Sequence, residues 1–211
     1  MGISRVPVVS IVACLLPEYG IGYQGQLPWR LAREMKYFRQ ATTATFDPTK
    51  RNAVVMGRKT WESIPARWRP LPGRLNVVVS RTYTSPWAHD ENGHVITSNS
   101  LQQCVRQLQE QARALGVERI YIMGGAEIYN QSYDLCDHLL VTELQVAPDG
   151  PAVLLDTFLA RDVLEQSFAK NSAGPRALLP PSVELPECPA TALEEGGFQF
   201  RFALYDHLNR D

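Results

Sequence analysis

The feature that most constrains the fold of this sequence is a series of short, continuous apolar runs. They occur at residues 6–16, 53–56, 75–80, 94–97, 119–123 and 138–144. Runs without polar alternation are typical of strands that are buried on both faces. Helical patterns lie between them, and strands that alternate with helices predict an α/β fold with a central, mainly parallel β-sheet flanked by helices.

The clearest helix and the last strand can be bounded from their end signals. Ser100 can cap a helix whose apolar face is marked by Leu101, Cys104, Val105, Leu108, Ala112 and Leu115. Gly116 is a typical residue to end such a helix. Residues 198–205 alternate strictly at first, which predicts an antiparallel C-terminal strand at an edge of the sheet.

The length of 211 residues suits one domain with a sizeable core, so we expect a single domain over residues 1–211. Residues 172–197 contain five prolines and interrupt the pattern of strands and helices. We interpret this segment as a long surface excursion without a core of its own.

Composition excludes several classes of function. The formal net charge of -1 argues against a nucleic-acid or membrane-surface partner, because both usually require a basic excess. The four cysteines form no CxxC motif and the histidines lack ligand spacing, so we expect no metal site and free thiols.

The N-terminal apolar run could be taken for a signal peptide. Residues 6–16 follow Arg5, but no small-residue cleavage site comes next and the run is too short to span a bilayer. A buried strand is the better interpretation. We therefore expect a cytoplasmic protein, with mitochondria and the nucleus as alternative compartments.

Glu34 is a carboxylate among apolar residues. Pro28 forbids a helix interior, so a helix should begin near Trp29 or Arg30. Leu31, Met35 and Phe38 then form a buried stripe, and Glu34 points to the same face. The other sides of this helix are expected to carry Arg30, Arg33, Lys36 and Tyr37.

Burial would raise the pKa of Glu34, because a carboxylate is poorly solvated among apolar side chains. Such a group can bind a cationic heterocycle or manage a proton. The alternative is a glutamate at the edge of the stripe whose carboxylate reaches water.

Residues 20–25 match the pattern GxGxxG after a strand, but they are not expected to bind a dinucleotide. That motif must open directly into a helix, and here Gln26, Leu27 and Pro28 intervene. The glycines suit a mobile loop beside the site.

Better phosphate sites follow two other strands. Residues 53–60 and 120–129 each read as a strand, glycine and a helix start, which favours an anion at the helix N-terminus. A third strand ends at Ser80, Arg81 and Thr82. Arg58 and Arg81 could pair with a terminal phosphate, or both could be solvated surface residues.

The proline-rich stretch 61–74 has two interpretations. It could be a pocket wall with a carboxylate clamp at Arg74, or a rigid loop.

A series of short motifs runs along the chain: IVA at 11–13, GIG at 20–22, LPW at 27–29, EMKYF at 34–38, VMGRKTWESIP at 55–65, RPLPGR at 69–74, VSR at 79–81, MGGAEIY at 123–129 and VT at 141–142. Taken together, these motifs resemble the dihydrofolate reductase family, in its monofunctional eukaryotic form and most of all its fungal members. They occur in family order, and the terminal strand matches again. From the length of 211 residues we expect the monofunctional form and not the form that also carries a thymidylate synthase domain.

The resemblance implies a catalytic group of Glu34, Leu27, Trp29 and Thr142. Glu34 would bind the 2-amino group and adjacent ring NH of the pterin, Thr142 would support it, and Trp29 would hold an ordered water. Arg74 would hold the α-carboxylate of the folate glutamate. The other implied substrate residues are Ile11, Val12, Ala13, Met35, Phe38, Ile64, Pro65, Leu71, Met123 and Tyr129.

The resemblance also implies NADPH as the cofactor. The residues implied to surround it are Ala13, Ile21, Gly25, Gly57, Arg58, Lys59, Thr60, Ser80, Arg81, Thr82, Asn99, Gly124, Gly125, Ala126, Glu127 and Ile128. Cis peptide bonds are expected at Gly124–Gly125 and Arg69–Pro70.

The implied reaction is hydride transfer from NADPH to C6 of dihydrofolate with protonation at N5, for which water is the expected donor. Dihydrofolate and antifolates such as methotrexate and trimethoprim are the expected ligands, and a monomer the expected state. Two alternatives remain open: a reductase acting on a pyrimidine intermediate of riboflavin synthesis, and a non-catalytic folate- or nucleotide-binding protein.

Three departures from the family pattern are visible. Met35 stands where vertebrate members have Phe, Trp68 replaces a smaller polar residue, and the proline-rich excursion is longer than in vertebrate members.

Overall fold

The computed structural model describes residues 5–210, which form two compact units. Within the described residues, the first unit contains residues 5–10 together with Thr42–Asp137, and the second contains Ile11–Ala41 and residues 138–210. Strand β1 (Val8–Leu15) contributes its first residues to one unit and the remainder to the other.

The first unit is built on a mainly parallel sheet with strand order β1-β7-β3-β4-β6-β5. Its further strands are β3 (Arg51–Gly57), β4 (Arg74–Val79), β5 (Ala88–His89), β6 (Val95–Ser98) and β7 (Val117–Ile122). Every neighbouring pair is parallel except β5 with β6. The continuous runs read from the sequence therefore form the buried parallel strands that were predicted.

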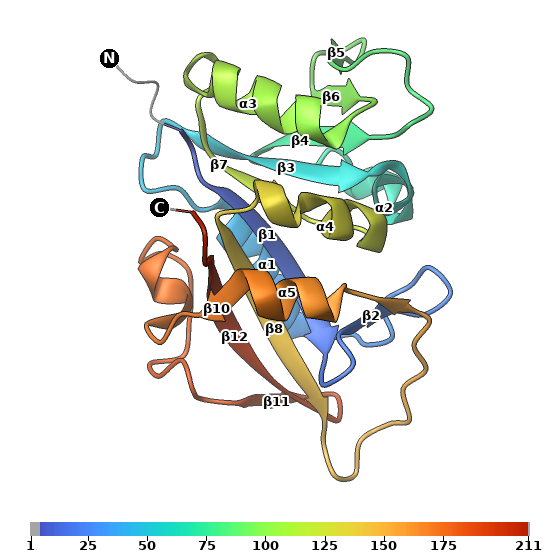
Figure 1. Ribbon diagram of the computed structural model, residues 1–211, viewed down its shortest axis with the longest axis vertical. Coiled ribbons are helices and arrows are strands. Elements are labelled where there is room, and N and C mark those ends of the chain that lie inside the picture. The colour runs from blue at the N-terminus through green and yellow to red at the C-terminus, as the bar shows by residue number, and fades with distance from the viewer. Residues whose placement is uncertain (1–4, 211) are drawn as a thin grey trace. The chain divides into compact units, whose positions relative to one another are not determined.

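Helices of the first unit pack on these strands, as Figure 1 shows for α3 and α4. They are α2 (Arg58–Ser63), α3 (Leu101–Leu115) and α4 (Ala126–Ser132), with short 3-10 turns η1 (Ala66–Trp68) and η2 (Tyr133–Leu135). The side chain of Ser100 accepts a hydrogen bond from Gln103 N at the start of α3, and Gly116 ends it. Both predicted ends of α3 are confirmed.

The second unit has a sheet with strand order β10-β12-β8-β1, in which β12 runs antiparallel to both β8 and β10. Its strands are β2 (Gly20–Gly22), β8 (His138–Val146), β9 (Thr157–Phe158), β10 (Phe168–Lys170), β11 (Leu193–Glu195) and β12 (Phe198–His207). The helical segments are α1 (Ala32–Thr43), whose last two residues belong to the first unit, α5 (Arg161–Ser167) and the 3-10 turn η3 (Gly174–Ala177).

The terminal strand is antiparallel as predicted, but its placement at an edge is wrong. Strand β12 pairs with β8 on one side and with both β10 and β11 on the other. Because β10 and β11 have only three residues each, neither is visible as a strand in the sequence pattern. The buried and exposed residues of β12 still alternate over Phe198, Phe200 and Phe202.

The predicted faces of α1 need two corrections. The helix begins at Ala32, two or three residues later than expected. Tyr37 was assigned to an outer side but is 2% exposed, whereas Met35 was assigned to the buried stripe and is 52% exposed. The buried stripe therefore runs through Leu31, Glu34 and Tyr37, a spacing of three residues that a helix accommodates as readily as four.

The proline-rich segment 172–197 buries several apolar side chains. Leu179 and Val183 are each 1% exposed, and Arg176 donates hydrogen bonds to the carbonyls of Pro180 and Val183. The segment is therefore ordered by its own hydrogen bonds as well as by packing. The expectation of one domain over the whole chain stays a prediction.

Candidate active site

Glu34 lies in the first turn of α1 and is 7% exposed. Thr142 Oγ1, on β8, donates a hydrogen bond to Glu34 Oε1 at 3.3 Å. Burial raises the pKa of Glu34 to about 7, and the hydrogen bond from Thr142 opposes this rise. A carboxyl group with such a pKa can hold or release a proton near neutrality. The predicted pair of Glu34 and Thr142 is brought together by the fold.

Aromatic side chains of β12 pack against the segment that carries Glu34. Tyr37 stacks on Phe202 with ring centroids 3.8 Å apart, and Phe202 is the cross-strand partner of Thr142. Trp29 meets Phe198 edge to face with centroids 6.2 Å apart. These contacts hold α1 and the residues before it against β12, the strand that pairs with the strand of Thr142.

Trp29 has one unsatisfied polar atom. Trp29 is only 5% exposed, and its indole Nε1 has no hydrogen-bond partner within residues 5–210. A buried N–H without an acceptor is costly, so this group is suited to donate to a bound water or ligand. This fits the role expected for Trp29.

The other predicted substrate residues are divided between the two units. In the second unit Ile11 and Val12 are buried on β1, Ala13 and Phe38 are half-buried, and Leu27 is 56% exposed. In the first unit Ile64, Leu71 and Met123 are half-buried, Pro65 is exposed and Tyr129 is buried.

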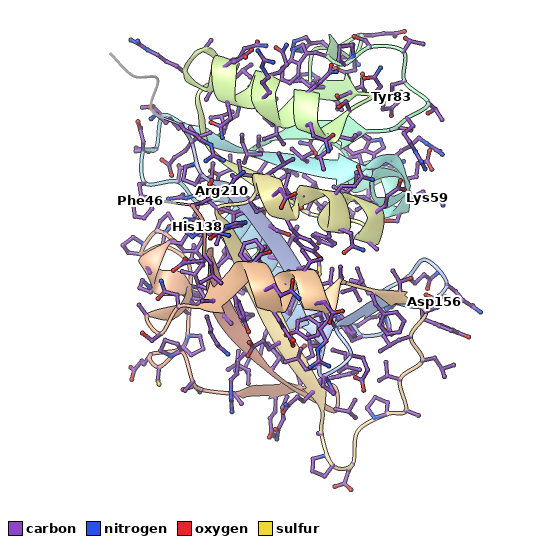
Figure 2. All side chains as sticks on the ribbon, viewed as in Figure 1. Phe46, Lys59, Tyr83, His138, Asp156 and Arg210 are labelled. Carbon is purple, nitrogen blue, oxygen red and sulfur yellow. The ribbon has the colours of Figure 1, made fainter. Side chains whose placement is uncertain are left out.

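The glycine-rich loop after β2 makes a tight turn and no helix. Tyr23 and Gln26 exchange two backbone hydrogen bonds of 2.9 and 3.0 Å around Gln24 and Gly25. Asp156, labelled in Figure 2, accepts a hydrogen bond from Gln24 N at 2.8 Å. The prediction that residues 20–25 do not form a dinucleotide motif is therefore confirmed.

In the first unit, the carboxyl ends of four parallel strands form one polar edge. Gly57 of β3 pairs in register with Val79 of β4, and Val79 pairs with Ser98 of β6. Val55 pairs with Ile122 at the end of β7. Most of the predicted cofactor residues follow these ends: Arg58, Lys59 and Thr60 after β3, Ser80, Arg81 and Thr82 after β4, Asn99 after β6, and Gly124, Gly125, Ala126, Glu127 and Ile128 after β7. The other three, Ala13, Ile21 and Gly25, belong to the second unit.

The two strand–glycine–helix joints are held together through their backbones. Gly57 N donates to Gly124 O at 2.8 Å, and the Gly124–Gly125 peptide bond is cis as expected. Gly124 has φ +100°, and a Cβ there would lie 2.7 Å from Cε2 of Tyr129. Only glycine fits at this point, which leaves bare backbone at the polar edge. Arg69–Pro70 is also cis as expected, and Leu16–Pro17 is a third cis bond.

The two arginines of this edge are each paired with a glutamate. Arg58 Nη1 lies 2.7 Å from Glu62 Oε1, and Arg81 Nη2 lies 3.2 Å from Glu127 Oε1. The side chain of Arg81 is 86% exposed, so its pair is weak. Both guanidinium groups follow neighbouring strand ends and can exchange their carboxylates for a phosphate. Lys59, which follows Arg58 on α2, is exposed and is labelled in Figure 2.

Arg74 is buried at the start of β4. Its Nε donates to Pro72 O at 3.0 Å and its Nη1 donates to Thr42 Oγ1 at 2.9 Å. Nearby, the amide of Asn76 exchanges hydrogen bonds with the backbone of Leu71. These bonds fix the guanidinium and the loop before it, as a rigid ligand clamp requires.

Residues 5–210 contain neither a cluster of metal-binding side chains nor a helix that could cross a membrane. No group of His, Cys, Asp or Glu residues could hold a metal ion. None of the helices in this range has the length and apolar character needed to cross a membrane. The cysteines Cys14, Cys104, Cys136 and Cys188 are free, and the first three are buried.

Comparison with known proteins identifies the family. A polar edge at the carboxyl ends of parallel strands is the usual nucleotide site of α/β proteins. The family model of dihydrofolate reductase matches residues 8–172. The chain is 46% identical to the dihydrofolate reductase of Saccharomyces cerevisiae over 96% of this chain and 98% of the yeast protein. It is also 46% identical to that of Candida albicans over 74% of this chain and 77% of the relative.

A solved structure agrees with this assignment. The dihydrofolate reductase of Schistosoma mansoni superposes with a TM-score of 0.69 at 30% identity, covering 96% of this chain and 99% of the other. The chain belongs to the dihydrofolate reductase family. The resemblance to fungal members predicted from the motifs is confirmed.

Proposed function

We propose that this chain reduces 7,8-dihydrofolate to 5,6,7,8-tetrahydrofolate with NADPH as the hydride donor. Members of this family are oxidoreductases that use a nicotinamide cofactor. The observation that carries the assignment of roles is the buried Glu34, whose carboxyl accepts a hydrogen bond from Thr142 and has a pKa of about 7.

Glu34 would bind the 2-amino group and adjacent ring NH of the pterin through its two carboxylate oxygens. Burial raises the pKa of Glu34 because an isolated negative charge is poorly solvated there. A proton on Glu34 itself, or a positive charge on a bound ligand beside it, relieves this cost. An ionised Glu34 would thus favour the protonated and more electrophilic pterin. Trp29 Nε1 would hold the ordered water that completes this part of the site.

The polar edge of the first unit fits NADPH. Hydroxyls of Thr60, Ser80 and Thr82 and the guanidinium groups of Arg58 and Arg81 supply hydrogen-bond donors and positive charge. The bare backbone at Gly124 permits close approach of the ligand. When bound, the cofactor supplies a hydride, while the chain supplies alignment and electrostatics.

Arg74 would bind the α-carboxylate of the folate glutamate, because its guanidinium is buried and already oriented by Pro72 and Thr42. Water would protonate N5, since Glu34 would contact the opposite side of the pterin ring. We further propose that the protein is a cytoplasmic monomer that also binds methotrexate and trimethoprim.

A spectroscopic assay tests this proposal. Consumption of NADPH should depend on added dihydrofolate and should fall by orders of magnitude at neutral pH in Glu34→Gln, with little change in NADPH binding. Glu194→Gln, which makes the same substitution at an exposed position, is the control. Turnover of a pyrimidine substrate alone, tight folate binding without NADPH consumption, or wild-type turnover by Glu34→Gln would refute the proposal.

A further inference from the structure

A glutamate remote in sequence caps the helix that carries Glu34. Glu195 Oε1 accepts a hydrogen bond from Ala32 N at 2.6 Å, and Glu195 Oε2 accepts one from Arg33 N at 3.1 Å. Leu31, which precedes the helix, has no side-chain acceptor to do this itself. Two of the free N–H groups at the start of α1 are thus satisfied by a single carboxylate from β11.

The position of Glu195 is fixed by a tight hairpin. Glu195 pairs with Phe198 across β11 and β12, which leaves Gly196 and Gly197 as a two-residue loop. Both have positive φ, 59° and 81°, as a type I′ turn requires. A Cβ on Gly196 would lie 3.5 Å from Leu31 Cδ2, so the tip of the hairpin lies against the start of α1.

Glu34 is the third residue of α1, the position from which a glutamate commonly turns back onto its own helix start. Here Glu195 occupies the N–H groups of Ala32 and Arg33, next to the N–H of Leu31 that such a glutamate would reach, and its negative charge repels a second carboxylate there. The carboxyl of Glu34 instead accepts from Thr142 at 3.3 Å. We propose that Glu195 is a positioning residue, which satisfies the start of α1 so that the carboxylate of Glu34 stays directed at Thr142.

A second contact between the same segment and α1 provides a comparison. Glu184 accepts hydrogen bonds from Lys36 Nζ at 2.7 Å and from Gln40 Nε2 at 3.1 Å, on the exposed side of the helix. This contact attaches the proline-rich segment to α1 without reaching its first turn. A variant at Glu184 therefore tests attachment of the segment to α1, whereas a variant at Glu195 tests capping of the helix.

Glu194 is a closer control for Glu195. It is adjacent on β11, carries the same charge and bonds Gln199 Nε2 at 2.6 Å, and no hydrogen bond from α1 to it is found in residues 5–210. Glu195→Ala and Glu194→Ala each remove one negative charge from β11, but only Glu195→Ala removes the hydrogen bonds to the start of α1.

The experiment measures steady-state kinetics and the titration of Glu34 by carbon NMR, with the Glu34 signal identified by its loss in Glu34→Gln. In Glu195→Ala we expect kcat/KM for dihydrofolate to fall about tenfold, because the carboxyl is misdirected. The KM for NADPH should stay unchanged. The pKa of Glu34 should fall, because the vacated N–H groups stabilise its ionised form. Glu194→Ala and Glu184→Ala should match the wild type.

Glu195→Gln keeps an acceptor oxygen at the same reach and should recover part of the loss. If Glu195→Ala does not fold, Glu195→Gln is used in its place, with Glu194→Gln as the control. A Glu34 titration in the Glu195 variant identical to that of its control would overturn the inference, whatever the activity.

The inference rests on the proposed role of Glu34, yet the two can fail separately. Wild-type turnover by Glu34→Gln would refute the proposed function, while the NMR titration tests the effect of Glu195 without any turnover.

Discussion

Removing the charge of Glu34 should stabilise the folded protein even though it removes activity. In the folded protein the pKa of Glu34 is raised from the ordinary value of 4.5 to about 7. This difference corresponds to roughly 3 kcal/mol of unfolding free energy that the folded protein loses when Glu34 is ionised. Glu34 is 7% exposed, so solvent screens little of this effect. In a chain of this size, 3 kcal/mol corresponds to about 6–12 °C in Tm.

The sign of the effect follows from the raised pKa. Below pH 4.5 the carboxyl is protonated in both the folded and the unfolded chain, so it contributes no pH dependence. As the pH rises toward 7 the unfolded chain loses the proton first, which favours unfolding. The stability gained by Glu34→Gln should therefore grow between pH 4.5 and about 7 and then level off.

Urea unfolding of wild type and Glu34→Gln at several pH values measures this difference. Other titrating groups cancel, because both proteins share them, and Glu194→Gln should show no pH-dependent gain. A stability difference between wild type and Glu34→Gln that stays constant across this pH range, or that is smaller at pH 8 than at pH 4, would refute the assigned burial of an ionised carboxyl.

Three further predictions concern the ligand-binding residues. Replacing Arg58 and Arg81 with Ala should raise the KM for NADPH by roughly tenfold or more per arginine and leave that for NADH unchanged; equal effects on both cofactors would exclude a 2′-phosphate contact. Arg74→Ala should weaken methotrexate far more than a small lipophilic inhibitor without a glutamate, as titration of both compounds would show; equal losses would make Arg74 a structural residue. Gly124→Ala should weaken NADPH binding and lower Tm, because its Cβ meets an aromatic ring at 2.7 Å; Gly93→Ala, which also has positive φ but open space around its Cβ, should retain NADPH binding.

The strands and α3 were predictable because their signals are local. Buried parallel strands need continuous apolar runs, and Ser100 and Gly116 mark the ends of α3 by their own capping chemistry. The strand–glycine–helix joints at Gly57 and Gly124 were found for the same reason.

The sequence did not show which side of α1 is buried, because this depends on contacts with β12, a strand far away in the sequence. Met35 and Tyr37 lie on either side of the stripe through Leu31 and Glu34, and both are compatible with helical spacing. Tyr37 is buried because Phe202 stacks on it, at a separation of more than 160 residues. Periodicity within a helix carries no information about that partner.

The cap by Glu195 was missed for a related reason. The two adjacent glycines at 196 and 197 before an alternating run are a signal for a hairpin. They do not reveal which helix start the preceding glutamate will reach. For Phe198 and Phe202, the sequence pattern predicts burial on a strand but does not reveal that they contact Trp29 and Tyr37.

The division of the chain has a consequence for its synthesis. The second unit combines residues 11–41 with residues from 138 onward, so Glu34 leaves the ribosome long before Thr142, Glu195 and Phe202 exist. The first unit, by contrast, is complete once Asp137 has emerged. A nascent chain stalled before Glu195 would therefore carry the helix of Glu34 without its cap and without Phe198 and Phe202, and the last stretch of translation governs when the carboxylate becomes buried.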